Sequence, residues 1–141
     1  MPNTIGKMGG GVEWVVEAIG CDPHRLACAT TLRDLCDDVV AELDLTVIGQ
    51  PQVHAFPAAI DSSVPGGVTA LYLLSESHLA CHTYPEHGFA TFNLYCCRRR
   101  PEWPWRIRLT EFLAARWVCV RELQRDWRAV HPPQSVWASS R

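Results

Sequence analysis

Three short segments with the composition of β-strands follow one another between residues 68 and 97. Val68–Leu74 is almost continuously apolar, a second segment begins at His78, and a third, Gly88–Cys97, has two alternating sets of side chains. The link from Tyr84 to Gly88 is typical of a turn, because proline presets φ and glycine tolerates positive φ. Strands joined by so short a link pair antiparallel, so this region predicts an antiparallel sheet.

Further strand-like and helical segments surround this central region. Residues 13–19 predict a strand, and Asp22 and Pro23 supply the N-cap and first position of a helix that runs to about residue 43. The remaining elements are expected as a strand over roughly 45–56, a loop over 57–67, a helix from Pro104 to Ala115, and a strand through Trp117 and Val120. The sequence therefore predicts an α+β fold, a two-layer α/β sandwich of a mostly antiparallel sheet with two helices on one face.

Length and charge limit the classes of protein that fit. The 141 residues suffice for one domain with a modest core. A net charge of −2 gives no basic field for nucleic acid, and no apolar run approaches the roughly 20 residues that span a bilayer. We therefore expect one domain over 13–130, between a flexible N-terminus, 1–12, and a loose C-terminal tail, 131–141, with neither nucleic acid nor a membrane as partner.

The cysteines indicate a reducing compartment. Seven are present and none forms a Cys-x-x-Cys pair, so the sequence has neither a zinc ribbon nor a thioredoxin-like motif. This pattern suits the cytoplasm better than an oxidising environment. Five lie among apolar residues and are expected to behave as small core hydrophobes: Cys21, Cys28, Cys36, Cys81 and Cys119.

A serine directly follows a glutamate just beyond the apolar segment Val68–Leu74. The Ser77 hydroxyl can attack the carbonyl of Glu76 and turn the amide into an ester. β-Elimination then releases the upstream chain and leaves a residue that hydrolyses to a ketone. The proton on the Ser77 α-carbon needs a base, and a histidine is the natural one. By itself, however, Glu-Ser-His is more often an ordinary strand start, so this chemistry depends on the residues around it.

The histidines His78 and His82 have a spacing that binds metals on helices. In an extended segment the same spacing separates the two rings by about 13 Å, and the sequence offers no third ligand. No metal is therefore expected.

The longer run that starts at Glu76-Ser77-His78, continues through His82-Thr83-Tyr84-Pro85-Glu86 and is followed by Cys97 resembles the processing site of the prokaryotic S-adenosylmethionine decarboxylases. A weaker likeness covers Val16–Asp22. The resemblance implies a self-cleaving lyase that decarboxylates S-adenosylmethionine and so supplies the aminopropyl donor for polyamine (spermidine) synthesis. It also implies that two processed chains pair sheet to sheet in a homodimer, with the sites near the interface.

The same resemblance implies roles for single residues. The chain would be cut after Glu76; Ser77 would become the covalent pyruvoyl cofactor that forms a Schiff base with the substrate; His82 would be the processing base; Thr69 would assist processing; and Cys97 would donate a proton to the product. Cys96 and Cys97 point to opposite faces of a strand, so only one of them can face the site. Cys97 is favoured by its register with Ser77.

Substrate recognition also follows from the resemblance. Tyr84 matches an aromatic residue that stacks on adenine, and Glu86 matches a glutamate that binds the ribose hydroxyls. A second stacking aromatic residue is expected upstream, and Phe56 is the candidate. Phe56 is equally well interpreted as a core residue, because it lies further from Ser77 than the family pattern has it.

Several positions depart from the family pattern and leave alternatives open. Tyr84 replaces a tryptophan, Asn93 an aspartate, and Arg98 a glycine, and Arg98–Arg100 occupies a segment that is acidic in familiar members. The three arginines are either a solvated turn or, if they face the site, a clamp for a carboxylate. Two other functions are therefore kept: a pyruvoyl-dependent decarboxylase of arginine, ornithine or another amino acid, and an unprocessed binding protein without catalysis.

Overall fold

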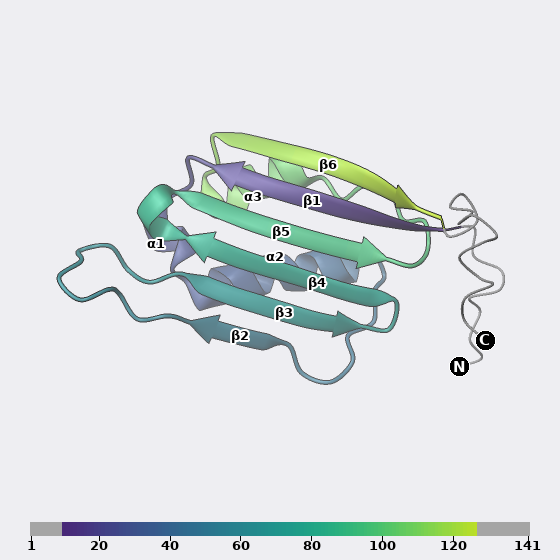
Figure 1. The fold of residues 1–141 in the computed structure, drawn as a ribbon, viewed down its shortest axis with the longest axis horizontal. Coiled ribbons are helices and arrows are strands. Elements are labelled where there is room, and N and C mark those ends of the chain that lie inside the picture. The colour runs from purple at the N-terminus through teal and green to yellow at the C-terminus, as the bar shows by residue number, and fades with distance from the viewer. Residues whose placement is uncertain (1–9, 127–141) are drawn as a thin grey trace, which may run out of the picture.

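A six-stranded antiparallel sheet forms the body of the protein in the computed structural model, which describes residues 10–126 (Figure 1). The strands lie side by side in the order β2-β3-β4-β5-β1-β6, and each neighbouring pair is antiparallel. Their bounds are Gly11–Ile19 for β1, Gln52–Ala55 for β2, Val68–Leu74 for β3, Ser77–Tyr84 for β4, Phe89–Cys96 for β5 and Trp117–Arg125 for β6.

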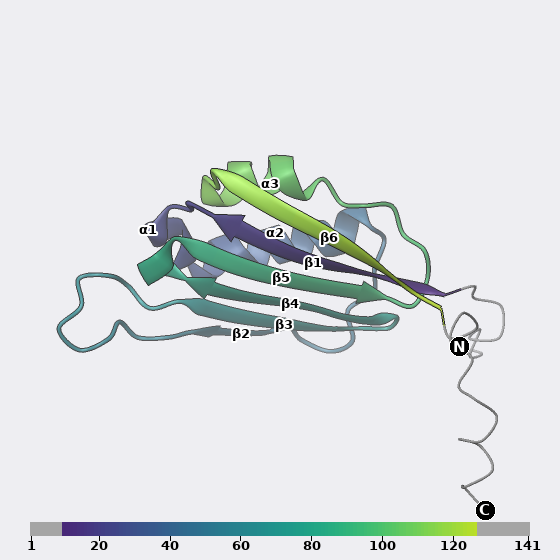
Figure 2. The ribbon, with the colours of Figure 1, turned by 45° about the horizontal axis from the view of Figure 1, so that its top comes forward.

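The helices cover one face of this sheet. Figure 2 shows the two longer ones, α2 (Ala29–Glu42) and α3 (Trp105–Leu113), on the same side, with the single turn α1 (Pro23–Leu26) beside them. A short 3₁₀ helix, η2 (Pro85–His87), joins β4 to β5, and Gly88 ends it with a φ of 57°. The predicted two-layer α+β architecture is confirmed.

The core lies between the sheet and these helices. In β3 and β5 every second residue is buried, as the period of a strand requires. These residues form one core cluster with the buried residues of α2 and α3; the Phe92 ring of β5, for example, lies 5.8 Å from the Trp105 ring of α3. Each buried large side chain contributes roughly 1.5–3 kcal/mol. The largest fully buried side chains include Trp14, Trp103, Trp105, Tyr72 and Phe92.

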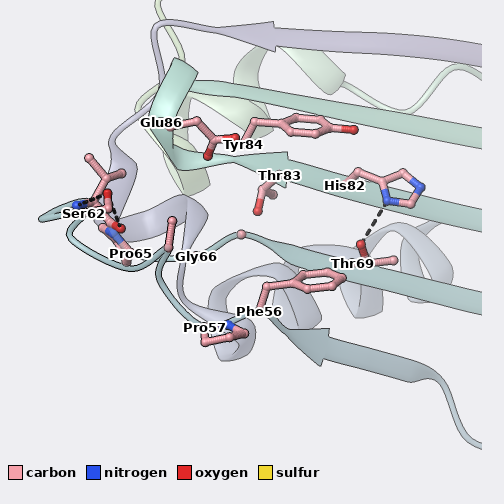
Figure 3. Close-up of a pocket in the computed structure, with 13 residues that line it drawn as sticks. Phe56, Pro57, Ser62, Pro65, Gly66, Thr69, His82, Thr83, Tyr84 and Glu86 are labelled. Carbon is pink, nitrogen blue, oxygen red and sulfur yellow. Dashed lines mark hydrogen bonds between the residues drawn. The ribbon is translucent and has the colours of Figure 1, made fainter.

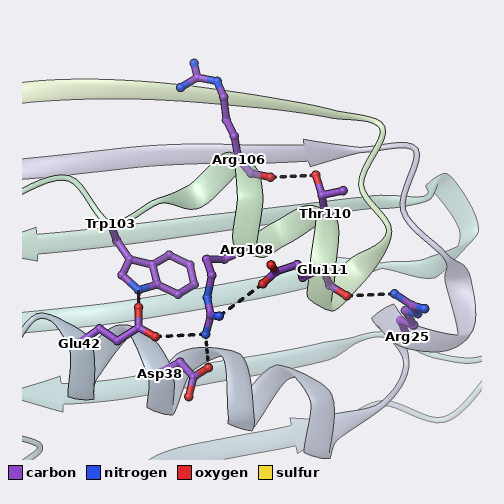
Figure 4. A network of polar contacts seen from close by, with 8 residues as sticks. All are labelled: Arg25, Asp38, Glu42, Trp103, Arg106, Arg108, Thr110 and Glu111. Atoms are coloured by element: carbon purple, nitrogen blue, oxygen red, sulfur yellow. Dashed lines mark hydrogen bonds and ion pairs between the residues drawn. The ribbon is translucent and has the colours of Figure 1, made fainter.

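Charged residues tie α3 to α2 at the edge of the core (Figure 4). The guanidinium of Arg108 pairs with Asp38, Glu42 and Glu111, and Trp103 Nε1 donates a hydrogen bond to the Glu42 carboxylate over 2.7 Å. The same guanidinium lies over the Trp103 ring, 5.5 Å from its centroid. This network therefore fixes how α3 sits on α2 and keeps the two longer helices on one face.

The helix expected from Pro23 to about residue 43 is interrupted, and this prediction is wrong in detail. Ala27 ends α1, and Cys28, with extended φ and ψ angles, caps the start of α2. The strand expected over 45–56 is likewise shorter. Gly49 has a φ of 69° and Pro51 lies two residues further on, so only Gln52–Ala55 pairs with β3, apart from an isolated bridge from Val47 to Leu74.

Two of the five cysteines assigned to the core are not buried. Cys28 is exposed and Cys119 is partly exposed, whereas Cys21, Cys36 and Cys81 are buried. Cys28 lies at the start of a helix, and Cys119 lies on the face of β6 that none of the described helices covers, so neither has apolar neighbours on every side. At the ends of the chain, β1 begins at Gly11 rather than at residue 13, and the tail expected over 131–141 lies outside the described residues.

The other face of the sheet, which we call the open face, is covered by no described helix (Figure 2). Its centre is polar, whereas large exposed hydrophobic side chains lie toward its margins: Ile19, Leu71, Leu73, Trp117 and Leu123. Trp117 is 68% exposed and Leu73 is 58% exposed. Apolar side chains gathered on one face of a monomer indicate a contact surface.

Candidate active site

The turn between β3 and β4 carries the expected cleavage site, and three contacts hold its glutamate. The Glu76 carboxylate lies 2.6 Å from Nη2 of Arg100 and 3.4 Å from Nε of Arg98. The main-chain carbonyl of Glu76 accepts a hydrogen bond of 3.1 Å from the backbone N–H of Cys97. The segment that follows β5 therefore fixes both the side chain and the carbonyl of the residue before the expected cut.

Ser77 begins β4 with a buried hydroxyl. Its Oγ has no hydrogen-bond partner within residues 10–126, and such an orphaned group costs about 1–3 kcal/mol. The N–H of Cys97 already points at the oxygen that gains negative charge if Oγ attacks the Glu76 carbonyl, which is the arrangement of an oxyanion hole. An unengaged nucleophile beside a polarised carbonyl fits the formation of a ketone at position 77.

The two neighbouring cysteines differ in their surroundings. The ladder between β4 and β5 pairs Ser77 with Cys96, not with Cys97, so register does not support the choice of Cys97. Cys96 is fully buried, and burial raises the pKa of its thiol to about 11. Cys97 is partly exposed and donates its backbone N–H to Glu76. Its role as proton donor remains a prediction, which now depends on exposure and on proximity to the cleavage site.

A pocket of about 470 Å³ lies near the other end of β4 (Figure 3). It is lined by five of the residues singled out from the sequence: Phe56, Thr69, His82, Tyr84 and Glu86. Thr69 and His82 are direct partners across the ladder between β3 and β4, and their Oγ1 and Nδ1 atoms lie within hydrogen-bonding distance at 3.0 Å. The structure therefore brings together the residues assigned to processing assistance and to substrate binding.

The aromatic residues of this pocket have exposed ring faces on which a planar group could stack. Phe56 is 51% exposed and meets His54 edge-on at 4.5 Å between centroids, so its alternative interpretation as a core residue is wrong. Tyr84 is stacked on Phe89 at 5.8 Å and stays partly exposed. Glu86 lies in η2, where its carboxylate is exposed at the rim.

Sequence reasoning missed the residues that shape the pocket floor. Thr83 is buried; its hydroxyl donates to the carbonyl of Leu26 over 2.6 Å and accepts from the N–H of Val68 over 2.8 Å. A Cβ on Gly67 would lie 2.1 Å from the carbonyl oxygen of Thr83, and one on Gly66 would lie 2.1 Å from that of Phe56. The adjacent glycines before an apolar strand were the available signal of this close backbone approach.

A chain of polar side chains crosses the open face from β4 through β5 to β1, near the start of β4. His78 Nε2 and Asn93 Oδ1 are 2.9 Å apart, and Asn93 donates to Glu13 over 2.8 Å. The hydrogen bond from Asn93, aided by the guanidinium of Arg125, holds the pKa of Glu13 below its usual value. Asn93, which departs from the family pattern, is therefore an organising residue of this face.

One chain does not bring the two groups of residues together. Ser77 and His82 are five residues apart on the same strand, a separation of roughly 16 Å. An odd spacing also sends their side chains to opposite faces. The first group, here called the cleavage end, consists of Glu76, Ser77, Cys97, Arg98 and Arg100. The second group, here called the pocket end, is the pocket with Thr69 and His82. The two groups are thus separate in one chain.

Within residues 10–126, no three histidine, cysteine, aspartate or glutamate side chains cluster as metal ligands. None of the helices in this part of the chain has the length and apolar character needed to cross a membrane.

Comparison with known proteins identifies the family. Residues 12–126 match the S-adenosylmethionine decarboxylase family. The S-adenosylmethionine decarboxylase proenzyme of Thermococcus kodakarensis is 32% identical over 117 residues, which cover 82% of this chain and 76% of that protein. The proenzyme of Caldicellulosiruptor saccharolyticus is 31% identical over 113 residues, which cover 79% and 84% of the two chains.

A solved structure supports the fold. The crystal structure of the adenosylmethionine decarboxylase from Aquifex aeolicus superposes with a TM-score of 0.67 at 23% identity, and the match covers 90% of this chain and 99% of that one. The resemblance read from the cleavage-site run is thereby confirmed, and the chain belongs to the S-adenosylmethionine decarboxylase family.

Proposed function

We propose that the chain cuts itself between Glu76 and Ser77 and then decarboxylates S-adenosylmethionine for polyamine synthesis. The observation that carries the proposal is the cleavage end itself, where the Ser77 hydroxyl, which has no partner among the described residues, adjoins a carbonyl that accepts the Cys97 N–H. A pyruvoyl group at position 77 supplies an electrophilic carbonyl that binds the substrate amine and accepts electrons as CO₂ leaves. Cys97 delivers the proton that replaces CO₂ on the substrate. We also propose a cytoplasmic location, because the seven free thiols suit a reducing compartment.

We further propose that a complete site needs two chains. The two sheets would pack with their open faces together, related by a two-fold axis that lies between them and perpendicular to β4. The two copies of β4 then run in opposite directions. The cleavage end of one chain then lies against the pocket end of the other. The partner's His82 and the partner's Thr69 approach residue 77 from the open face, the side opposite its buried hydroxyl, where His82 would take the proton from the α-carbon. The exposed apolar margins of the open face, with Leu73 and Trp117 among them, support such a face-to-face homodimer.

A complementation experiment tests this shared site. Ser77→Ala and His82→Ala chains each stay uncut when expressed alone, because one lacks the nucleophile and the other the base. In a mixed dimer one of the two sites has both groups, so co-expression should yield cleavage of the His82→Ala chain, identified by a tag and by mass. Mixed dimers that form, as measured by affinity capture, and yet remain uncut would contradict the shared site.

The ribose contact is the feature that separates a nucleoside substrate from a free amino acid. A carboxylate that accepts two ribose hydroxyls makes two charge-assisted hydrogen bonds of about 1.5–3 kcal/mol each. Glu86→Gln should therefore lower kcat/KM for S-adenosylmethionine by roughly tenfold or more. The measurement is ¹⁴CO₂ release from carboxyl-labelled S-adenosylmethionine, arginine and ornithine.

The control is Glu102→Gln, since Glu102 is an exposed carboxylate away from the pocket. It should leave all three rates unchanged. Release of CO₂ from arginine or ornithine alone would overturn the nucleoside substrate and leave the pyruvoyl chemistry intact.

A further inference from the structure

Two arginines hold the single carboxylate of the residue that precedes the cut. Arg100 is mostly buried, with 18% of its side chain exposed, and Arg98 is half exposed. Glu76 is the only carboxylate paired with either of them within residues 10–126. Arg100 Nε is buried and donates to no acceptor in this part of the chain. Oε2 of Glu76 is also buried and accepts no hydrogen bond within these residues, so one donor and one acceptor are left over. The cleavage end of the precursor nevertheless carries two guanidinium charges against one carboxylate charge.

Self-cleavage produces a second carboxylate at this place. Attack by Ser77 Oγ on the Glu76 carbonyl carbon breaks the C–N bond; the hydroxyl proton passes to the nitrogen, and an ester is formed. A base then removes the α-proton of residue 77, the Cβ–Oγ bond breaks, and the Glu76 main-chain carboxylate leaves with the bonding electrons. Dehydroalanine remains at position 77, and water converts it, through its imine tautomer and with loss of ammonia, into the pyruvoyl group. The leaving group of the elimination is thus an anion on the residue that the arginines already hold.

On the basis of the self-cleavage proposed above, we propose that Arg98 and Arg100 receive the departing main-chain carboxylate of Glu76 and thereby accelerate the β-elimination. Two guanidiniums then face two carboxylates, and the charge at the cleavage end is balanced. Arginine suits this task because its planar fork matches a carboxylate bidentately. The solvated turn considered from the sequence does not describe Arg100, which is largely buried.

The test follows cleavage of freshly translated precursor over time with and without hydroxylamine. Hydroxylamine attacks the ester and forms a hydroxamate on Glu76 and a free amino group on Ser77, so it bypasses the elimination. Arg100→Ala should slow spontaneous cleavage by about tenfold or more. Hydroxylamine should restore cleavage of this variant, and mass spectrometry should show the hydroxamate. Arg100→Lys should recover part of the spontaneous rate.

Arg99→Ala is the matched control, because it removes the same charge from the same tripeptide, and Arg99 is exposed and has no hydrogen bond or ion pair among the described residues. It should cleave like the wild type. Glu76→Gln separates leaving-group stabilisation from mere positioning of the Glu76 side chain: it should cleave faster than Arg100→Ala. Equal slowing of these two variants would overturn the proposal, as would an Arg100→Ala chain that hydroxylamine does not rescue.

Two further outcomes are distinguishable. If Arg100→Ala fails to fold by circular dichroism, Arg98→Ala decides, because its half-exposed side chain can be removed without opening the core. Normal spontaneous cleavage of Arg98→Ala would then overturn the proposal. A wild-type chain that never cleaves would refute the proposed function itself, whereas normal cleavage of a folded Arg100→Ala chain would refute only the role of the arginines.

Discussion

Ser77→Ala leaves the chain uncut. No hydroxyl remains to attack the Glu76 carbonyl, so the loss of processing should be complete rather than partial. On a denaturing gel the variant should run as one chain of 15.8 kDa, whereas the wild type gives one fragment that ends at Glu76 and another that begins at residue 77. The downstream wild-type fragment should lack a free amino terminus and react with borohydride.

Ser75→Ala is the control for this result. Ser75 lies in the same turn and is exposed, and it uses its backbone N–H rather than its side chain to contact Thr46. The Ser75→Ala chain should be processed normally. Cleavage of Ser77→Ala at the same bond would show that another nucleophile is used.

Cys97→Ala should still be cut but should turn over poorly. The loss of a positioned general acid typically lowers a rate by about 10²–10⁴-fold. The partly exposed Cys97 contacts Glu76 through its backbone N–H, which alanine retains, so the oxyanion contact and processing should survive. The measurement is kcat for CO₂ release by processed enzyme, with the processed fraction determined by mass spectrometry.

Cys96→Ala provides the comparison. Cys96 is buried among core residues and burial raises the pKa of its thiol, so its replacement should lower stability by about 0.5–3 kcal/mol and change kcat far less. A larger loss of kcat in Cys96→Ala than in Cys97→Ala would transfer the proton donor to Cys96, the residue that faces Ser77 across the ladder.

The local parts of the fold were predictable, because they depend on residues close together in sequence. The apolar run Val68–Leu74 and the alternation of side chains in Gly88–Cys97 predict strands. Pro85 and Gly88 predict the tight connection that leads from β4 into β5. The break at Cys28 was not predictable, since apolar spacing continues across it. Nor was the insertion of β1 between β5 and β6, because pairing between distant segments leaves no periodic signal.

The candidate site was predictable as a set of residues but not as an arrangement. The run from Glu76 to Glu86 contains most of the candidate site residues. Only the pairing of β4 with β3 and β5 shows that Ser77 and His82 lie toward opposite ends of one strand. The ion pairs of Glu76 with Arg98 and Arg100 could likewise not be predicted from the sequence, because a run of arginines after a strand is usually solvated. Tertiary contacts decide these points.

The position of β1 has a consequence for the cut enzyme. The upstream fragment contributes β1, β2 and β3, and β1 lies hydrogen-bonded on both sides between two strands of the downstream fragment. The nick therefore does not loosen the domain into halves: the fragments are interdigitated and can separate only if three ladders break together. Once they are denatured, however, reassembly becomes a bimolecular reaction between chains that no peptide bond tethers. The six-stranded sheet of uncut Ser77→Ala should thus re-form at a rate independent of protein concentration, whatever the rate of later pairing between chains, whereas re-formation of the sheet in the processed enzyme should depend on concentration.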